Sequence, residues 1–213
     1  MHRAVIRRYK ACKELSDFWL SLLYATVAFV GALVVNNYAI VFATEHASNN
    51  VTDLILSNIP TYDVDNLFVY GTFFVIGITA LILFENPQRI PFALNAIALF
   101  LIIRSGFTSL THVAPYPHPE VNFGETIQRS FFGGDRFFSG HTGLPFLGAL
   151  MLWGEKPFRY FYLAASLGFA IIVFLGHLHY SIDVFAAFFI TYTIFQIAKW
   201  LFPKEWEWFG AKS

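Results

Sequence analysis

Six long apolar stretches constrain the fold of this chain more than any other feature of its sequence. Each holds between 17 and 26 residues, and a helix of that length crosses a hydrocarbon core about 30 Å thick. Because backbone polar groups in lipid must be satisfied internally, we expect each stretch to be an α-helix. The six expected spans are Phe18–Ala43, Leu67–Phe84, Ile90–Leu110, Phe137–Trp153, Phe158–Leu175 and Ile182–Phe202.

The composition agrees with a membrane protein. Hydrophobic residues make up 56% of the chain and charged residues 13%, whereas a soluble domain carries about 25% charged residues. The expected fold is an all-α integral membrane protein with six transmembrane helices and cytoplasmic termini. We expect a basic cytoplasmic segment at 1–17, one membrane domain at 18–202 and a cytoplasmic tail at 203–213. The single cysteine, Cys12, excludes an intrachain disulfide.

The distribution of basic residues predicts the orientation. With the N-terminus inside, eleven of the fourteen lysine and arginine residues fall on the cytoplasmic side, as the positive-inside rule requires. These eleven are Arg3, Arg7, Arg8, Lys10, Lys13, Arg89, Lys156, Arg159, Lys199, Lys204 and Lys212. Only Arg104, Arg129 and Arg136 fall on the outer side, together with six of the seven histidines. The long outer segments 44–66 and 112–136 are either lids over a site or plain connectors.

Ser139-Gly140-His141-Thr142 is the first of two polar segments next to apolar spans. Ser139 is placed to cap a helix, and a helix N-terminus offers N–H groups and a positive dipole to phosphate. Gly140 lets a substrate approach the backbone, and His141 would stand beside the phosphate as a proton donor. The alternative is a helix cap followed by a histidine at the membrane interface.

His177-Leu178-His179-Tyr180-Ser181-Ile182-Asp183 is the second segment. His179 and Asp183 are four residues apart, so on a helix they would share one face. A carboxylate there can fix the imidazole tautomer and leave the other ring nitrogen to act as a nucleophile. The alternative for Asp183 is a helix-start residue that gains under about 1 kcal/mol from the helix dipole.

The two segments together resemble the type 2 phosphatidic acid phosphatase superfamily, and within it the sphingomyelin synthase-like branch. Residues 134–142, GDRFFSGHT, are similar to the branch motif GDxxxSGHT. Residues 177–184, HLHYSIDV, are similar to HxHY[ST]xDV, and Arg104 with the threonines after it is similar to RxxTxxxTxLP. The resemblance covers nearly the whole chain after residue 17.

The resemblance implies a role for each of these residues. His179 would form a phosphohistidine, Asp183 would orient it, and His141 would protonate the leaving alcohol. Val173 stands where the phosphatases carry an arginine, and Phe138 where they carry a proline, which favours the synthase-like branch.

Further residues are candidates for binding the substrate of His141, His179 and Asp183. Arg104 and Arg136 are expected to bind phosphate with Ser139 and Gly140, because an arginine fork holds phosphate oxygens in pairs. Four other residues are candidates for substrate binding: Arg129, Asp135, His177 and Tyr180. Each has an alternative: solubilising the loop for Arg129, an arginine partner for Asp135, contact with water for His177 and the aromatic belt for Tyr180.

These observations predict a lipid phosphotransferase that moves a phospho-headgroup from a phospholipid to a lipid alcohol such as ceramide or diacylglycerol. The first alternative is a phosphatase that uses water as acceptor. A metalloenzyme with histidine ligands and a transporter are less favoured. The expected partners are the lipid substrates and the bilayer, with no cofactor, metal or nucleic acid. The active site is expected on the exoplasmic face.

Overall fold

A computed structural model describes residues 8–10, 12, 17–117 and 137–210, and the regular secondary structure of these residues is entirely helical. Candidate site residues Arg129, Asp135 and Arg136 lie outside the described residues. The long helices are α2 (Phe18–Glu45), α3 (Asp65–Glu85), α4 (Ile90–Leu110), α7 (Lys156–Leu175) and α8 (Ser181–Leu201). The shorter elements are α6 (Gly140–Met151), α9 (Pro203–Gly210) and the 3₁₀ turns η1 (Leu56–Asn58) and η2 (Pro87–Arg89).

Within the described residues, five helices are long and apolar enough to cross a membrane, and these indicate a multi-pass membrane protein. The fourth expected span, Phe137–Trp153, is shorter than the sequence suggested. Its helix, α6, has 12 residues and is therefore about 18 Å long at 1.5 Å per residue. The Ser139 side chain caps its start, accepting a hydrogen bond from the Thr142 backbone, so the apolar residues 137 and 138 precede the helix.

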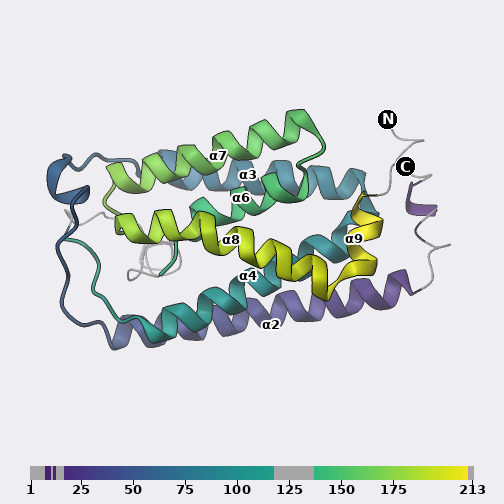
Figure 1. The fold of residues 1–213 in the computed structure, drawn as a ribbon, viewed down its shortest axis with the longest axis horizontal. Helices are drawn as coiled ribbons and strands as arrows, with labels where there is room; N and C mark the ends of the chain where they lie inside the picture. Colours follow the sequence, from purple (N-terminus) through teal and green to yellow (C-terminus); the bar gives the residue numbers. More distant parts are fainter. Residues whose placement is uncertain (1–7, 11, 13–16, 118–136, 211–213) are drawn as a thin grey trace.

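The helices form a layered bundle (Figure 1). Helix α2 lies along α4 on one side, α3 and α7 lie on the other, and α6 and α8 run between them. Ala25, Ala32 and Ala39 of α2 are buried at seven-residue intervals, and such small side chains let helices approach closely. The rest of α2 exposes large apolar side chains, as expected of a surface that faces lipid.

One end of the bundle is closed by the turns between helices and by α9. Arg89 of η2 pairs with Glu155 at 2.5 Å, and its guanidinium lies 5.3 Å from the Phe209 ring centre. Trp206 of α9 packs against Phe92. The segment expected to be a tail at 203–213 therefore contains a helix that docks on the bundle.

The opposite end holds the long connection from α2 to α3 and the starts of α6 and α8 (Figure 1). Backbone hydrogen bonds link this connection to the rest of the bundle: the Ser48 N–H donates to the His112 carbonyl oxygen at 2.6 Å, and the Tyr62 N–H donates to the Leu175 carbonyl oxygen at 2.8 Å. Segment 44–66 is thus fastened to the bundle near both of its ends. This end carries both polar segments singled out in the sequence.

Candidate active site

The starts of α6 and α8 are joined by a hydrogen bond. The Ser139 N–H donates to the Asp183 carbonyl oxygen at 3.1 Å, and Ser139 is fully buried. Because the backbone at Ser139 is tied to α8, the first turn of α6 has a fixed position relative to Asp183. The two polar segments, 35 or more residues apart in the sequence, meet at one place in the fold.

His179 and Asp183 are in contact. His179 Nδ1 lies 3.5 Å from Asp183 Oδ2, and both side chains are at least nine-tenths buried. The expected reason for the contact was wrong, because α8 begins at Ser181 and His179 precedes it. Asp183 instead closes a capping box, in which its Oδ2 accepts the Tyr180 N–H at 3.1 Å. The carboxylate therefore contacts both the backbone of the turn and the imidazole that the turn carries.

His141 is the second residue of α6, and two aromatic rings surround its imidazole. The ring centre of Phe68 lies 4.1 Å away and that of Phe169 lies 5.9 Å away. Phe68 belongs to α3 and Phe169 to α7, so helices on two sides limit the rotation of this side chain. The sequence does not single out these two phenylalanines, because the chain contains 26.

Arg104 of α4 is buried beside the start of α6. Its Nε donates to the Phe138 carbonyl oxygen at 2.8 Å and Nη1 to Asn36 Oδ1 at 3.4 Å. A Cβ added to Gly140 would lie 3.5 Å from Arg104 Nε, so the guanidinium lies directly against the N-terminus of α6. A cation and the positive end of a helix dipole thus face the same space, which suits an anionic ligand.

His177 and Tyr180 contact the α2–α3 connection and the residues that follow α4. His177 is buried, and its Nδ1 lies 3.1 Å from Thr61 Oγ1, so it does not face water. Tyr180 is also buried; its hydroxyl donates to the Ala114 carbonyl oxygen at 2.9 Å and accepts the Val51 N–H at 3.1 Å. Both side chains hold segments of the outer end together, and substrate binding by either remains a prediction.

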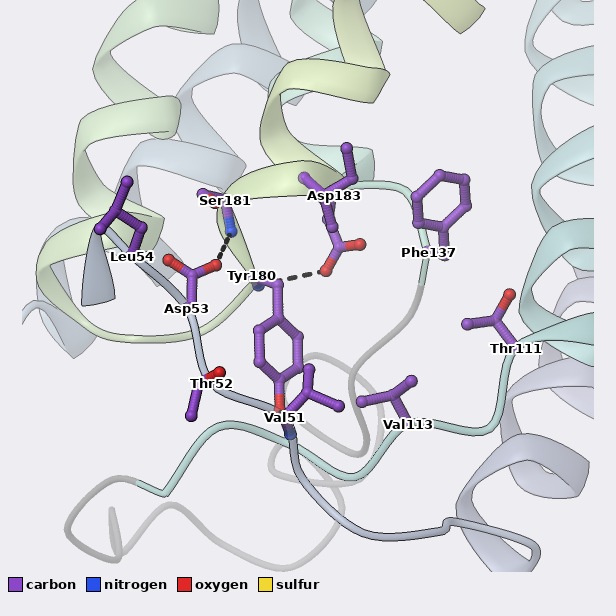
Figure 2. A pocket seen from close by; sticks show the side chains of 11 residues that line it. Val51, Thr52, Asp53, Leu54, Thr111, Val113, Phe137, Tyr180, Ser181 and Asp183 are labelled. Atoms are coloured by element: carbon purple, nitrogen blue, oxygen red, sulfur yellow. Dashed lines mark hydrogen bonds between the residues drawn. The ribbon is translucent and has the colours of Figure 1, made fainter. Parts of the chain in front are cut away.

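A cavity of about 410 Å³ lies beside the turn that precedes α8 (Figure 2). Asp183 lines it from α8 and Tyr180 from the turn before α8. Thr111 and Phe137 line it from the two ends of the α4–α6 connection, and Asp53 lines it from the α2–α3 connection. Asp53 was missed in the sequence, where it is one acidic residue in a polar connector. Asp53 lies three residues before η1, a position typical of an aspartate that caps a turn. Aspartates occupy such positions in many solvated turns, so the pattern does not indicate a functional residue.

No metal-binding arrangement occurs among the residues that the structure describes, in the sense of three or more His, Cys, Asp or Glu side chains grouped around one point. The chemistry of the assembled residues is that of anion binding, proton transfer and nucleophilic attack. His179 is the candidate nucleophile, His141 the candidate proton donor, and Arg104 with the start of α6 the candidate phosphate site.

Comparison with known proteins gives one match. A family model described as PAP2 superfamily C-terminal matches residues 133–200, a range that contains both histidine segments. No curated protein and no solved structure matches the chain significantly. The match supports an assignment of this part of the chain to the PAP2 superfamily, whose members are phosphatases or phosphotransferases.

Proposed function

We propose that the protein is a membrane lipid phosphotransferase resembling the sphingomyelin synthases. It moves a phospho-headgroup from a phospholipid to a lipid alcohol through a phosphohistidine at His179. The observation that carries the proposal is the buried contact of His179 Nδ1 with Asp183 Oδ2 at 3.5 Å, at the point where Ser139 ties the start of α6 to α8. A histidine oriented by a carboxylate beside a helix N-terminus is suited to attack a phosphate ester.

In the first step, His179 attacks the phosphorus atom of the phospholipid. With the proton on Nδ1, which lies 3.5 Å from Asp183 Oδ2, the lone pair resides on Nε2, which forms the new P–N bond. The P–O bond to the diacylglycerol or ceramide oxygen breaks, and His141 donates a proton to that oxygen. Catalytic hydrogen bonds are often long without substrate, so a distance of 3.5 Å suits this pairing.

In the second step, a lipid alcohol replaces the departed one. His141, now neutral, takes the proton of the acceptor hydroxyl while its oxygen attacks phosphorus, and the P–N bond to His179 breaks. Backbone N–H groups in the first turn of α6, at Gly140 and His141, would donate to the phosphate oxygens. Arg104, against Gly140, supplies positive charge there.

The surroundings of the site favour a phosphodiester over a phosphate monoester as the substrate. Val173, where a phosphatase would carry an arginine, is fully buried in an apolar cluster with Phe68, Phe169 and Val184. That position offers no charge to the dianion of a phosphate monoester. A phosphodiester carries one negative charge fewer, and Arg104 with the helix N-terminus suits it better. Hydrolysis by the same phosphohistidine is the second candidate function.

We also propose that the active site faces the exoplasmic side. This orientation is supported by basic residues at the end of the bundle opposite the site: Arg89, Lys156, Lys199 and Lys204. Cys12, the one native cysteine, is only 2% exposed, so a thiol reagent should react mainly with cysteines that are introduced by mutation. In intact cells an impermeant maleimide should label Ser48→Cys and spare Lys156→Cys; the reverse pattern would place the site inside.

The transferase proposal is tested with purified protein in detergent micelles and a phosphodiester lipid labelled in its headgroup. We expect the label to move to ceramide or diacylglycerol when either is present, with slower release to water when both are withheld. The His179→Ala variant should do neither. Release of phosphate from phosphatidic acid, at a rate unaffected by any lipid alcohol, would contradict transfer and favour the phosphatase.

A further inference from the structure

We propose that Asp53 is a positioning residue for the nucleophile. It fastens the outer loop between α2 and α3 onto the N-terminus of α8 and thereby fixes the turn that carries His179. The inference rests on the proposed function for the role of His179 and extends it to a residue in a different part of the chain.

Asp53 is buried at 7% exposure, and both its carboxylate oxygens accept backbone hydrogen bonds. Oδ1 accepts from Ile55 N at 2.8 Å and Leu56 N at 3.0 Å, within the loop. Oδ2 accepts from Ser181 N, the first residue of α8, at 2.7 Å. One side chain therefore bridges the loop and the catalytic helix across 128 residues of sequence.

The charge of Asp53 is held by these donors and by the helix. Burial raises the pKa of the carboxyl, but the N–H groups of Leu56, Ser181 and Ile55 and the Ser181 hydroxyl together lower it below its ordinary value. No lysine or arginine in the described part of the chain forms an ion pair with Asp53. The carboxylate thus stabilises the positive end of α8, where each such contact is typically worth about 0.3–1 kcal/mol.

Asp53 leaves Asp183 available for His179. Two neighbouring N–H groups at the start of α8 need acceptors, those of Tyr180 and Ser181. Asp183 serves Tyr180 and Asp53 serves Ser181, as Figure 2 shows with the two carboxylates on either side of this turn. Without Asp53, Asp183 is the remaining carboxylate at the turn, and its position relative to His179 would no longer be fixed.

The rest of the loop supports the same turn. His179 lies outside α8, so helical hydrogen bonds do not set its position. The loop instead contacts residues on both sides of it: Thr61 bonds to His177 at 3.1 Å, and Val51 bonds to Tyr180 at 3.1 Å. His177 has a left-handed backbone with φ of 52°, an unfavourable conformation for a residue other than glycine, which these contacts hold in place.

Asp53→Asn tests the attachment, and Asp63→Asn is the matched control. Asp63 is an exposed carboxylate of the same loop whose Oδ1 accepts only the nearby Asp65 N–H at 3.2 Å. An amide at position 53 would turn its NH₂ group toward one of the N–H donors. We expect hydrogen exchange in the 177–183 peptide of the purified protein to accelerate at least about tenfold in Asp53→Asn and to stay unchanged in Asp63→Asn.

A second measurement compares the rate of headgroup transfer by the folded fraction of each variant. We expect kcat of Asp53→Asn to fall about 10- to 100-fold with KM within about twofold, the usual cost of losing a residue that orients a reacting group. Because kcat is calculated per folded molecule, loss of folded protein does not contribute to this change. Asp53→Glu keeps the charge, but its side chain is one methylene too long to keep all three hydrogen bonds. Its kcat should therefore lie between those of the wild type and Asp53→Asn.

Three outcomes overturn the inference. The first is exchange in Asp53→Asn equal to that of Asp63→Asn, and the second is faster exchange with unchanged kcat. If Asp53→Asn does not fold, a wild-type kcat in Asp53→Glu is the third. If the wild-type protein were inactive on every phospholipid, the proposed function would be refuted together with the catalytic part of this inference. If the wild type is active, the variants test the inference separately from the proposed function.

Discussion

Asp183→Asn is the substitution that most directly tests how the nucleophile is oriented. Asp183 Oδ2 now makes two contacts, with Tyr180 N at 3.1 Å and His179 Nδ1 at 3.5 Å. The asparagine carbonyl oxygen at the Oδ2 position can keep both contacts, because one oxygen atom makes both of them. It carries no negative charge, however, and so no longer stabilises the imidazolium that forms when Nε2 is phosphorylated. The variant should therefore keep its cap and lose most of its activity.

The magnitude follows from the loss of this negative charge. In the serine-protease triad, the corresponding change from aspartate to asparagine lowers kcat about 10⁴-fold, and we expect a loss of about 10²- to 10⁴-fold here. Stability should fall by no more than about 1–2 kcal/mol, because one backbone bond to the cap is retained. The assay follows transfer of a labelled headgroup to ceramide in micelles, with Tm measured on the same preparations.

Asp63→Asn again serves as the control, since that carboxylate is exposed and its Oδ1 accepts the N–H of Asp65 within the same loop. An Asp183→Asn variant with wild-type kcat would refute the orienting role and leave Asp183 as a helix cap. A variant that loses activity only in proportion to its loss of folded protein would refute it as well.

Three further predictions use other parts of the structure. His141→Ala should lower the rate strongly for lipids with alcohol leaving groups and much less for a nitrophenyl ester, whose leaving group needs no proton; equal losses on both substrates would contradict the proton-donor role. Gly143→Ala should lower stability by about 1–3 kcal/mol, because its Cβ would lie 2.8 Å from the Phe100 ring and from Thr191 Oγ1; thermal unfolding should show Gly140→Ala, whose nearest contact is 3.5 Å, to be less affected. Since the pKa of Asp53 is below its ordinary value of 3.8, the stability it adds is present above that pH and lost as the pH falls through the folded-state pKa; the Tm difference between wild type and Asp53→Asn should accordingly shrink below pH 3.8, and a constant difference would contradict this.

The length of the apolar stretches predicted six helices, and five of them are long helices in the described part of the chain. It did not predict the length of α6, because hydropathy does not register the hydrogen bond from Thr142 N to Ser139 Oγ that starts the helix. The helix begins at Gly140, although the two phenylalanines before it are as apolar as the residues after it.

The contact between His179 and Asp183 was predicted from a spacing of four, but helical geometry is not its cause. The contact comes from a capping box that keeps His179 outside α8, and the sequence pattern fits either arrangement. Asp53 and the two rings around His141 could not be predicted, since each depends on contacts between residues far apart in the chain. Such contacts are set by packing and leave no local pattern.

The most direct test of the account is to trap the intermediate on His179. The His141→Ala variant, which should slow transfer to an acceptor but not the departure of a nitrophenolate, is incubated with a nitrophenyl phosphodiester and no acceptor alcohol, then digested at alkaline pH and analysed by mass spectrometry. We expect the phospho-headgroup on His179, acid-labile and removed by added ceramide, and its absence in His179→Ala. A preparation that turns over lipid while the adduct resides on another residue, or forms on none, would contradict the central claim.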